Sequence, residues 1–391
     1  MFRRALFIST LLLVAACPKS ETPSGGGGGG GGAATGGGAA TGGGSGTGGG
    51  GSQIDSGTDS GMPDAGPPYS VTVFDGVRIS SPNGSDAGPN LQHASADFSL
   101  PGAPFTSVTL VVDLASTCYP FSSWAQNPPP SGQNWPADCD AFDRNFELYL
   151  ELPDGGPSQE LVRAITPFGG PLHFEQDITD SVYAGGDRKL GVSITTWSDG
   201  AGQVSGSNGG WNVTARIDAV PGPAPRKVVA VIPLTYHSDT GPDAAGEFDF
   251  TLPSTSTYAF LEYRVTGHGG ATGTQGCIGP AEEFCQRTHH VRLDGEDTWS
   301  GTPWRTDCDQ LCTVAHYGSP GFDYCQENPC GAMGSVRAPR ANWCPGSVTP
   351  PIGLDSATFG MPGAHHVGYT IDNAVPGGEW RVSATVFAYQ L

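Results

Sequence analysis

The stretch Ser107-Val108-Thr109-Leu110-Val111-Val112 alternates polar and apolar residues and then becomes apolar, which is typical of a half-buried β-strand. Similar short runs recur along the chain, separated by segments rich in Gly, Pro, Asn and Asp: residues 146–150, 190–194, 227–233, 258–266 and 382–389. Strands of this length and spacing, without a long helical pattern, predict an all-β sandwich or jelly-roll fold.

One proline-rich segment divides this strand pattern into two parts. Val220-Pro221-Gly222-Pro223-Ala224-Pro225 carries three prolines in six residues. Because proline lacks the amide hydrogen that a sheet requires, we expect this segment to lie outside any sheet. It predicts a boundary between two β-sandwich domains, residues 69–222 and 226–391.

The composition excludes several classes of protein. The 391 residues include 61 Gly and 34 Pro, and only 14% of the residues are charged, which argues against coiled coils and helical bundles. The formal net charge is −20, with no cluster of Lys or Arg. Binding to nucleic acid requires such a cluster to displace counterions from phosphate. Nucleic acid is therefore excluded as an expected partner.

The N-terminus has the features of an export signal. Arg3 and Arg4 precede an apolar run over residues 5–16 that ends in Leu13-Val14-Ala15-Ala16-Cys17. The small residues before Cys17 resemble the lipobox of bacterial lipoproteins, in which the cysteine is acylated; an ordinary signal peptide is the alternative. We thus expect a signal peptide over residues 1–16 and a lipid anchor in the membrane at Cys17. The mature protein would be an exported bacterial lipoprotein in the outer membrane, in the periplasm or on the cell surface.

The segment after the expected anchor predicts a tether. Residues 25–52 are glycine interrupted only by Ala, Thr and Ser. Such a composition cannot bury enough apolar surface to become ordered. We expect residues 17–68 to form a disordered Gly-rich linker between the anchor and the first domain.

The other nine cysteines favour disulfides, because export exposes them to an oxidising compartment. Cys118 and Cys139 are the two in the first domain, so they are expected to pair with each other. The remaining seven lie at positions 277, 285, 308, 312, 325, 330 and 344. The spacings of Cys308 with Cys312 and of Cys325 with Cys330 leave a zinc site as the less favoured alternative.

Three motifs, in this order, resemble the peptide-N-glycosidase F family: Cys139-Asp140-Ala141-Phe142-Asp143-Arg144, then Glu283-Phe284-Cys285-Gln286-Arg287-Thr288-His289, then Arg340-Ala341-Asn342-Trp343-Cys344-Pro345-Gly346. The likeness extends from about Ser70 to the C-terminus. It implies a secreted protein with two consecutive jelly-roll domains. It also implies metal-free hydrolysis, without a cofactor, of the amide between asparagine and the first GlcNAc of N-linked glycans or glycopeptides.

The resemblance also implies roles for individual residues. The catalytic aspartate of the family falls on Asp143, and its second functional carboxylate falls on Glu283. The expected substrate-binding positions are Arg144, Arg340, Trp197, Trp343 and Thr195. The implied disulfides are Cys118–Cys139, Cys277–Cys285 and Cys308–Cys344, which leaves Cys312, Cys325 and Cys330 unexplained by the family pattern.

The chain departs from the family pattern at three places. Thr195 occupies a position where the family carries a functional glutamate. The altered loop between Cys277 and Cys285 makes Glu282 an alternative to Glu283. The long Cys118–Cys139 loop contains Trp124 and Trp135, which could stack on sugar rings or fill the loop.

Two other functions stay open. A non-catalytic glycan- or glycopeptide-binding lipoprotein would explain the loss of the glutamate at Thr195. A copper-dependent monooxygenase of similar architecture is a weaker alternative, suggested by His289-His290 and His365-His366. Neighbouring histidines on a strand face opposite sides of the sheet, and the chain has no His-x-His motif, so copper chemistry is not expected.

Overall fold

The computed structural model describes residues 66–80, 92–153, 155–198, 200–241, 244–270, 276–356, 358–375 and 377–391. The expected signal peptide, the lipidation residue Cys17 and the linker up to residue 65 lie outside the described residues. Over the ranges given, no helix has both the length and the apolar character needed to cross a membrane.

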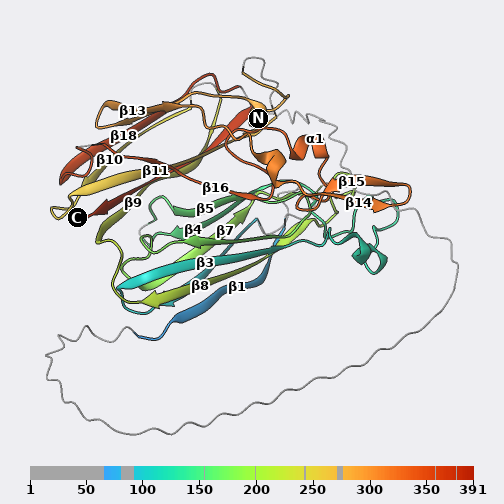
Figure 1. Cartoon of the computed structure of the whole chain (residues 1–391), viewed down its shortest axis with the longest axis horizontal. Helices are drawn as coiled ribbons and strands as arrows, with labels where there is room; N and C mark the ends of the chain where they lie inside the picture. The colour runs from blue at the N-terminus through green and yellow to red at the C-terminus, as the bar shows by residue number, and fades with distance from the viewer. Residues whose placement is uncertain are drawn as a thin grey trace, which may run out of the picture.

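The first sandwich consists of two antiparallel sheets, drawn in the lower part of Figure 1. One sheet has the order β1 (Tyr69–Ser80), β8 (Gly210–Pro221), β3 (Phe105–Ala115) and β6 (Leu172–Asp177). The other has the order β16 (Ser347–Thr349), β5 (Gln159–Ile165), β4 (Asn145–Glu151), β7 (Gly186–Ile194) and β2 (His93–Leu100).

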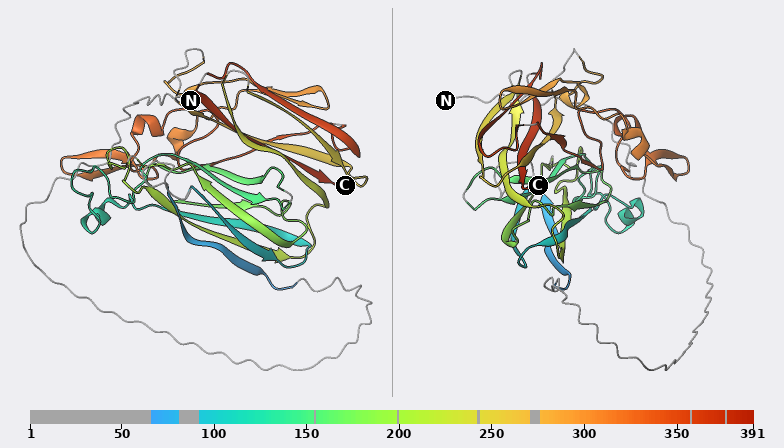
Figure 2. Two further views of the ribbon diagram at one scale, coloured as in Figure 1. Left: turned by 180° about the vertical axis from the view of Figure 1, so that it is seen from behind. Right: turned by 60° about the vertical axis from the view of Figure 1, so that its left-hand side comes forward.

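The second sandwich lies along the first, as Figures 1 and 2 show. Its outer sheet has the order β10 (Ala245–Leu252), β18 (Gly363–Ile371), β12 (His289–Leu293) and β13 (Glu296–Gly301). Its inner sheet has the order β17 (Ile352–Leu354), β11 (Tyr258–Gly269), β19 (Gly378–Tyr389) and β9 (Val228–Thr240). The all-β prediction is confirmed, and each run of residues expected as a strand lies within one strand, except that Lys227 precedes β9.

Short elements decorate the connections between strands. They are the 3₁₀ turns η2 (Phe121–Ala125), η3 (Glu282–Phe284) and η4 (Cys308–Leu311), the hairpin β14 (Val314–Gly318) and β15 (Gly321–Cys325), and the single-turn helix α1 (Met333–Val336). The hairpin and the η2 segment project together at one end of the molecule (Figure 1), where Phe121 packs edge-on against Tyr317 and Tyr324.

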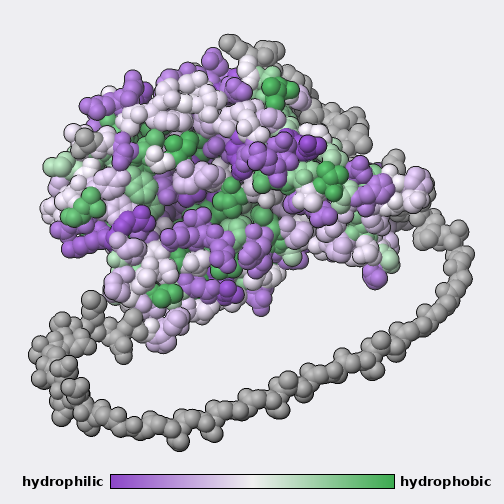
Figure 3. Space-filling model, in the orientation of Figure 1, coloured by the Kyte–Doolittle hydropathy of each residue, from purple (hydrophilic) through white to green (hydrophobic). Residues whose placement is uncertain are grey.

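Strand alternation builds a separate apolar core in each sandwich. On β3, Val108, Leu110, Val112 and Leu114 are buried, and they share the first core with Trp211. On β11, alternate residues from Ala259 to Val265 enter the second core. The outer surface mixes hydrophilic and hydrophobic residues over both sandwiches on the face shown in Figure 3. The apolar faces are thus used within each sandwich, and polar contacts join the two.

The expectation that the whole proline-rich segment lies outside a sheet is wrong. Val220 pairs with Ser107 and Pro221 with Phe105, so both belong to β8. This is possible because β1 starts opposite Ala219, and the last two residues of β8 have a neighbour on one side alone. A proline without an amide hydrogen is tolerated where no second strand needs that hydrogen.

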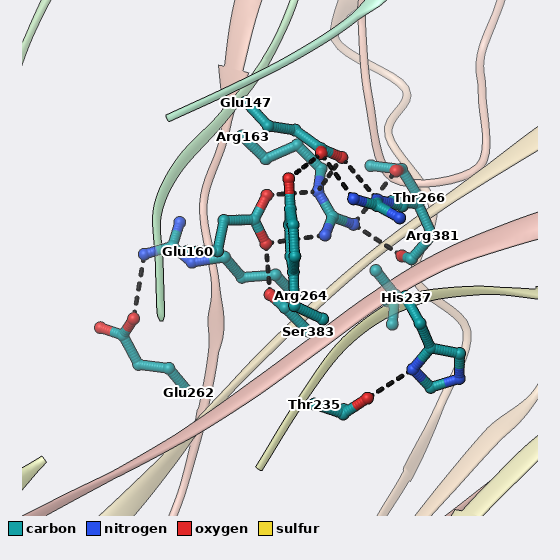
Figure 4. A network of polar contacts seen from close by, with 12 residues as sticks. Glu147, Glu160, Arg163, Thr235, His237, Glu262, Arg264, Thr266, Arg381 and Ser383 are labelled. Atoms are coloured by element: carbon teal, nitrogen blue, oxygen red, sulfur yellow. Dashed lines mark hydrogen bonds and ion pairs between the residues drawn. The ribbon is translucent and has the colours of Figure 1, made fainter. Parts of the chain in front are cut away.

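The two sandwiches are joined by a network of buried charges (Figure 4). Arg381 on β19 donates to both carboxylate oxygens of Glu147 on β4, at 2.8 Å each, and the Tyr236 hydroxyl donates to the same carboxylate. Arg163 on β5 is fully buried and donates to Glu160 at 2.7 and 2.8 Å and to the Arg381 carbonyl at 2.6 Å. These bonds satisfy charged groups that burial would otherwise make costly.

We predict that Arg381→Met lowers the free energy of unfolding by about 3–5 kcal/mol, because the buried carboxylate of Glu147 loses its bidentate partner and keeps only the Tyr236 hydroxyl and the more distant Arg163, at 3.8 Å. Urea denaturation of the variant measures this loss. Adding Glu147→Gln should recover part of it by removing the orphaned charge. Arg216→Met, which breaks a surface pair with Asp218, is the matched control and should change stability by less than about 1 kcal/mol. An Arg381→Met variant as stable as this control would contradict the prediction.

Candidate functional site

Disulfides hold the three sequence motifs in place. All three implied pairs form, Cys118–Cys139, Cys277–Cys285 and Cys308–Cys344, and Cys312 pairs with Cys325. The zinc alternative is therefore wrong, because the sulfurs of Cys308, Cys312 and Cys325 are already bonded to other cysteines.

In the first motif, two acids have different tasks. Asp140 is fully buried and accepts hydrogen bonds from Arg144 at 3.0 and 3.1 Å and from the Thr196 hydroxyl at 2.5 Å. It also accepts from the backbone amide of Phe142 at 3.2 Å, which closes a turn. Asp143 follows this turn just before β4, with its side chain 14% exposed. Asp140 thus holds the turn that presents Asp143.

The neighbouring acids of the second motif also diverge. Glu282 is fully buried and accepts hydrogen bonds from Arg287 at 2.7 and 3.0 Å and from the indole of Trp380 at 2.9 Å. Glu283, whose side chain is 20% exposed, accepts a hydrogen bond from Arg340 at 2.7 Å. The geometry therefore favours Glu283 over Glu282 as the carboxylate that faces the site.

Arg340 brings the two candidate carboxylates together. Its guanidinium is fully buried between the rings of Phe284 and Trp343, whose centroids lie 4.6 and 4.4 Å from its central carbon. Nη1 donates to Glu283, and Nη2 lies 3.6 Å from Asp143 Oδ2. An acid from the first sandwich and an acid from the second thus meet at one cation.

Burial shifts the protonation of both carboxyls. It raises the pKa of Asp143, opposed by the positive charges of Arg340 and Arg144. It also raises the pKa of Glu283, to about 7, opposed by Arg340 and reinforced by the negative charge of Asp143. Two interacting acids titrate as a pair, so protonation of one of these carboxyls changes the pKa of the other.

The expected substrate-binding residues fall into an exposed and a buried group. Trp197 is 40% exposed and stacks on Phe142, with ring centroids 6.2 Å apart and an angle of 25° between the planes. The guanidinium of Arg144 lies 5.0 Å from each ring centroid. Thr195 is exposed, and its amide donates to the carbonyl of Asn145 at 3.2 Å. Trp197 therefore offers an open aromatic face next to the turn that carries Asp143.

Arg144, Arg340 and Trp343 are buried, and their expected role in substrate binding stays a prediction. The indole of Trp343 donates to the Gly267 carbonyl at 2.8 Å, while its ring packs behind Arg340. Arg144 is held by Asp140. These side chains fix the groups that face the site.

The tryptophans of the Cys118–Cys139 loop fill the loop. Trp124 and Trp135 are 9% and 5% exposed and lie in an apolar cluster with Cys118, Phe168 and Val336. The indole of Trp124 donates to the Cys118 carbonyl at 3.0 Å. Of the two roles considered for them, packing is the one that this burial supports.

The paired histidines lie on strands and have separate partners. His289 is buried and contacts the Tyr263 hydroxyl at 3.0 Å, while its neighbour His290 contacts Asp372 at 3.1 Å. His365 contacts Asp294, and His366 contacts Asp249 and Glu247. In the part of the chain that the structure describes, no three His, Cys, Asp or Glu side chains gather in a group that could hold a metal ion.

One contact of Arg340 had no signal in the sequence. Nη2 donates to the backbone carbonyl and to the hydroxyl of Ser335 in α1, at 2.9 and 3.0 Å. Ser335 lies in the Cys308–Cys344 loop, outside all three motifs. A single serine in a loop has no spacing that would distinguish it from its neighbours, and its role depends on where the loop folds.

The chain is similar in sequence to a known family and to a curated relative. Residues 236–388 match the family described as peptide-N-glycosidase F, C terminal. A curated relative, peptide-N(4)-(N-acetyl-beta-D-glucosaminyl)asparagine amidase F of Elizabethkingia miricola, is 26% identical over 233 residues. That alignment covers 54% of this chain and 57% of the relative, so the chain spans somewhat more than half the length of the relative it matches.

Solved structures show the same fold. PNGase F, a glycosylasparaginase from Flavobacterium meningosepticum, superposes with a TM-score of 0.59 at 20% identity, covering 83% of this chain and 96% of the other. PNGF-II superposes with a TM-score of 0.59 at 19% identity, covering 83% of this chain and 66% of the other. The two-sandwich arrangement of this chain is thus the double jelly roll of those structures.

We predict that Glu283→Gln becomes more stable relative to the parent as the pH rises. The pKa of Glu283 is about 7 in the folded state against 4.5 for an unperturbed glutamate, so ionisation is less favourable when the protein is folded. The parent therefore loses stability as the pH rises from about 4.5 through 7, whereas glutamine does not titrate.

Urea denaturation at pH 5 and pH 8 tests this sign. The stability difference between variant and parent should grow by on the order of 2 kcal/mol over this interval. Glu175→Gln, an exposed acid on β6, is the control and should show little change. A constant difference between Glu283→Gln and the parent at the two pH values would rule out a raised pKa.

Proposed function

Because this chain belongs to the peptide-N-glycosidase F family, we propose that it is an amidohydrolase that cleaves the amide between asparagine and GlcNAc in N-linked glycopeptides. The observation that carries the proposal is the meeting of Asp143 and Glu283, one from each sandwich, at the buried guanidinium of Arg340. This arrangement contains the groups that hydrolysis of an amide needs: a base, a second carboxyl and a cation.

The proposed reaction uses these groups as follows. Glu283 holds a water molecule by a hydrogen bond, and Asp143 accepts a proton as the water oxygen bonds to the carbonyl carbon of the asparagine side chain. The positive charge of Arg340 offsets the negative charge that develops on the carbonyl oxygen. The C–N bond then breaks, and the proton held by Asp143 passes to the departing amine. The products are an aspartate in the peptide and a glycosylamine.

The protonation of the pair suits this reaction. With its pKa raised to about 7, Glu283 is partly protonated near neutral pH, and its ionisation is coupled to that of Asp143. One member can then act as a base while the other donates a hydrogen bond. Two carboxylates that were both fully ionised could not divide these tasks.

Trp197 supports the choice of a sugar as part of the substrate. Trp197 follows Thr195 by two positions, and its ring packs against Phe142 and Arg144, which hold it in place. Sugar rings present C–H groups that pack on such aromatic faces. We therefore assign Trp197 as a platform for the glycan beside Asp143.

The disulfides support the expected export of the protein, and they do not bear on the expected lipid anchor or membrane. The disulfides between described cysteines are typical of proteins exported to an oxidising compartment. The lipid anchor at Cys17 and a position at the outer membrane or cell surface stay predictions. A lipid analysis of the N-terminal peptide from the mature protein would test them.

A second candidate function is glycan binding without hydrolysis. Thr195, exposed next to the aromatic platform, stands where the family carries a glutamate, and threonine cannot carry that charge. A protein of this kind would keep the contact to Trp197 and bind the glycan without turnover.

We predict that Asp143→Asn abolishes release of glycan from a denatured N-glycopeptide by the purified protein, with a loss of at least about 10²–10⁴-fold in kcat, because asparagine cannot accept the proton. Mass spectrometry of the released glycan measures the rate, and a chelator should not change it. Asp75→Asn, the same substitution at an exposed position on β1, is the control.

The outcomes separate the two candidate functions. Release by the parent and by Asp75→Asn, but not by Asp143→Asn, would establish hydrolysis that depends on Asp143. Tight binding of glycopeptide by all three proteins without release by any would favour the binding function instead.

We predict that Trp197→Ala raises KM for the glycopeptide about 2–10-fold and leaves kcat within about 2-fold, because it removes a stacking contact and no proton-transferring group. A rate series with increasing substrate measures both constants. Trp299→Ala, which alters a tryptophan on β13 in the outer sheet, is the control. A fall in kcat with unchanged KM would contradict the role of a binding platform.

A further inference from the structure

Helix α1 is a single turn that anchors the buried guanidinium of Arg340. Ser335 accepts two hydrogen bonds from Arg340 Nη2, one with its backbone carbonyl oxygen at 2.9 Å and one with its hydroxyl oxygen at 3.0 Å. Val336, the next residue, is 1% exposed and lies in the apolar cluster with Phe168 and Cys330. The packing of Val336 therefore fixes the position of Ser335.

The number of N–H groups on Arg340 Nη2 decides whether that atom can donate a hydrogen bond to Asp143. A guanidinium Nη atom carries two hydrogens, and the two Ser335 oxygens lie where they can accept both of those on Nη2. The distance from Nη2 to Asp143 Oδ2 is 3.6 Å, which is beyond the range of an N–H···O hydrogen bond. Asp143 thus experiences the charge of Arg340 without a hydrogen bond from it. Glu283, by contrast, accepts one from Nη1 at 2.7 Å.

The surroundings of Arg340 restrict how it can move. The rings of Phe284 and Trp343 lie against the guanidinium, which limits movement out of its plane. Movement within the plane would carry Nη2 toward Asp143 or away from it. The hydrogen bonds of Nη2 to Ser335 oppose an approach to Asp143 directly, and the hydrogen bond of Nη1 to Glu283 restricts the same movement.

We propose that Ser335 is a positioning residue, which occupies both N–H groups of Arg340 Nη2 and so prevents a hydrogen-bonded ion pair between Arg340 and Asp143. The consequence for catalysis rests on the proposed function. A base that is not locked in such an ion pair accepts a proton from water more readily.

The charged groups around Asp143 determine how a substitution at Ser335 would change the pKa of Asp143. They are Arg340 and Arg144, which favour the ionised form, and Asp140 and Glu283, which oppose it. Arg144 is already bound to Asp140 by two hydrogen bonds. Loss of the Ser335 hydroxyl would free one N–H group of Arg340, with Asp143 as an acceptor 3.6 Å away. A hydrogen bond from an arginine favours a carboxylate and lowers its pKa by about 1 unit or more.

The test compares Ser335→Ala with Ser335→Thr, which keeps the hydroxyl, and with Ser300→Ala, an exposed serine on β13. Alanine is a better helix former than serine, so the change should not disrupt α1. The protein is labelled with ¹³C at the aspartate side-chain carboxyl, and the Asp143 signal is assigned by its loss in Asp143→Asn. The titration midpoint of that signal is then followed by NMR.

We expect the midpoint of Asp143 to fall by about 1 pH unit in Ser335→Ala, a tenfold change in its ionisation constant, and to stay at the parent value in the two other variants. In glycan release, the acidic limb of the kcat/KM profile should move down by the same amount, and the maximal rate should fall several-fold. A purely structural role would lower the rate at every pH without moving the limb.

An unchanged Asp143 midpoint in Ser335→Ala would overturn the proposal, whatever the rates. Because the NMR titration does not depend on turnover, it separates the two hypotheses. A shifted midpoint in a protein that releases no glycan would support the positioning role and contradict the proposed hydrolysis. Glycan release with an unshifted midpoint would do the reverse.

Discussion

The bidentate contact between Arg381 and Glu147 is one of several contacts that hold the two sandwiches in a fixed relation, and the candidate site depends on that relation. Glu147 lies on β4, which begins two residues after Asp143, while Arg381 lies on β19 of the other sandwich. The bidentate geometry allows little sliding between them, because both carboxylate oxygens and two guanidinium nitrogens are engaged. A site that takes one carboxylate from each sandwich needs such a fixed relation, since small misplacements of reacting groups cost large factors in rate.

The two acidic motifs share one principle of construction. In each motif, one acid is buried and hydrogen-bonded within the fold, and a nearby acid faces the candidate site. Asp140 and Glu282 are fully buried, and each binds an arginine of its own segment, Arg144 and Arg287. Asp143 and Glu283 are partly exposed and face Arg340. The internal acid is satisfied by several donors, which is what keeps a buried carboxylate tolerable and the local turn rigid.

Arg340 is a buried cation that joins the two acidic motifs, and it interacts with its neighbours in two different ways. Glu283 and Ser335 receive its hydrogen bonds, and Asp143 receives its field alone. Burial raises the pKa of both carboxyls, and Arg340 limits the rise. The chemistry of the site therefore depends on a loop of the second sandwich, closed by Cys308–Cys344, that carries Ser335 close to a carboxyl of the first.

Local pattern predicted strands at six runs of the chain, because alternation and turn residues act over a few neighbours, and the family resemblance implied three disulfides that form. The motifs also named Asp143, Glu283 and Arg340, which the fold brings together. Properties that depend on distant neighbours were not readable in this way. Pro221 joins a sheet because β1 starts opposite Ala219. Trp343 is buried because Arg340 and Gly267 cover it. Glu283 rather than Glu282 faces Arg340, because Arg287 and Trp380 bind Glu282. Each of these outcomes was decided by packing between segments far apart in the chain, since burial and hydrogen-bond competition exist only once those segments meet.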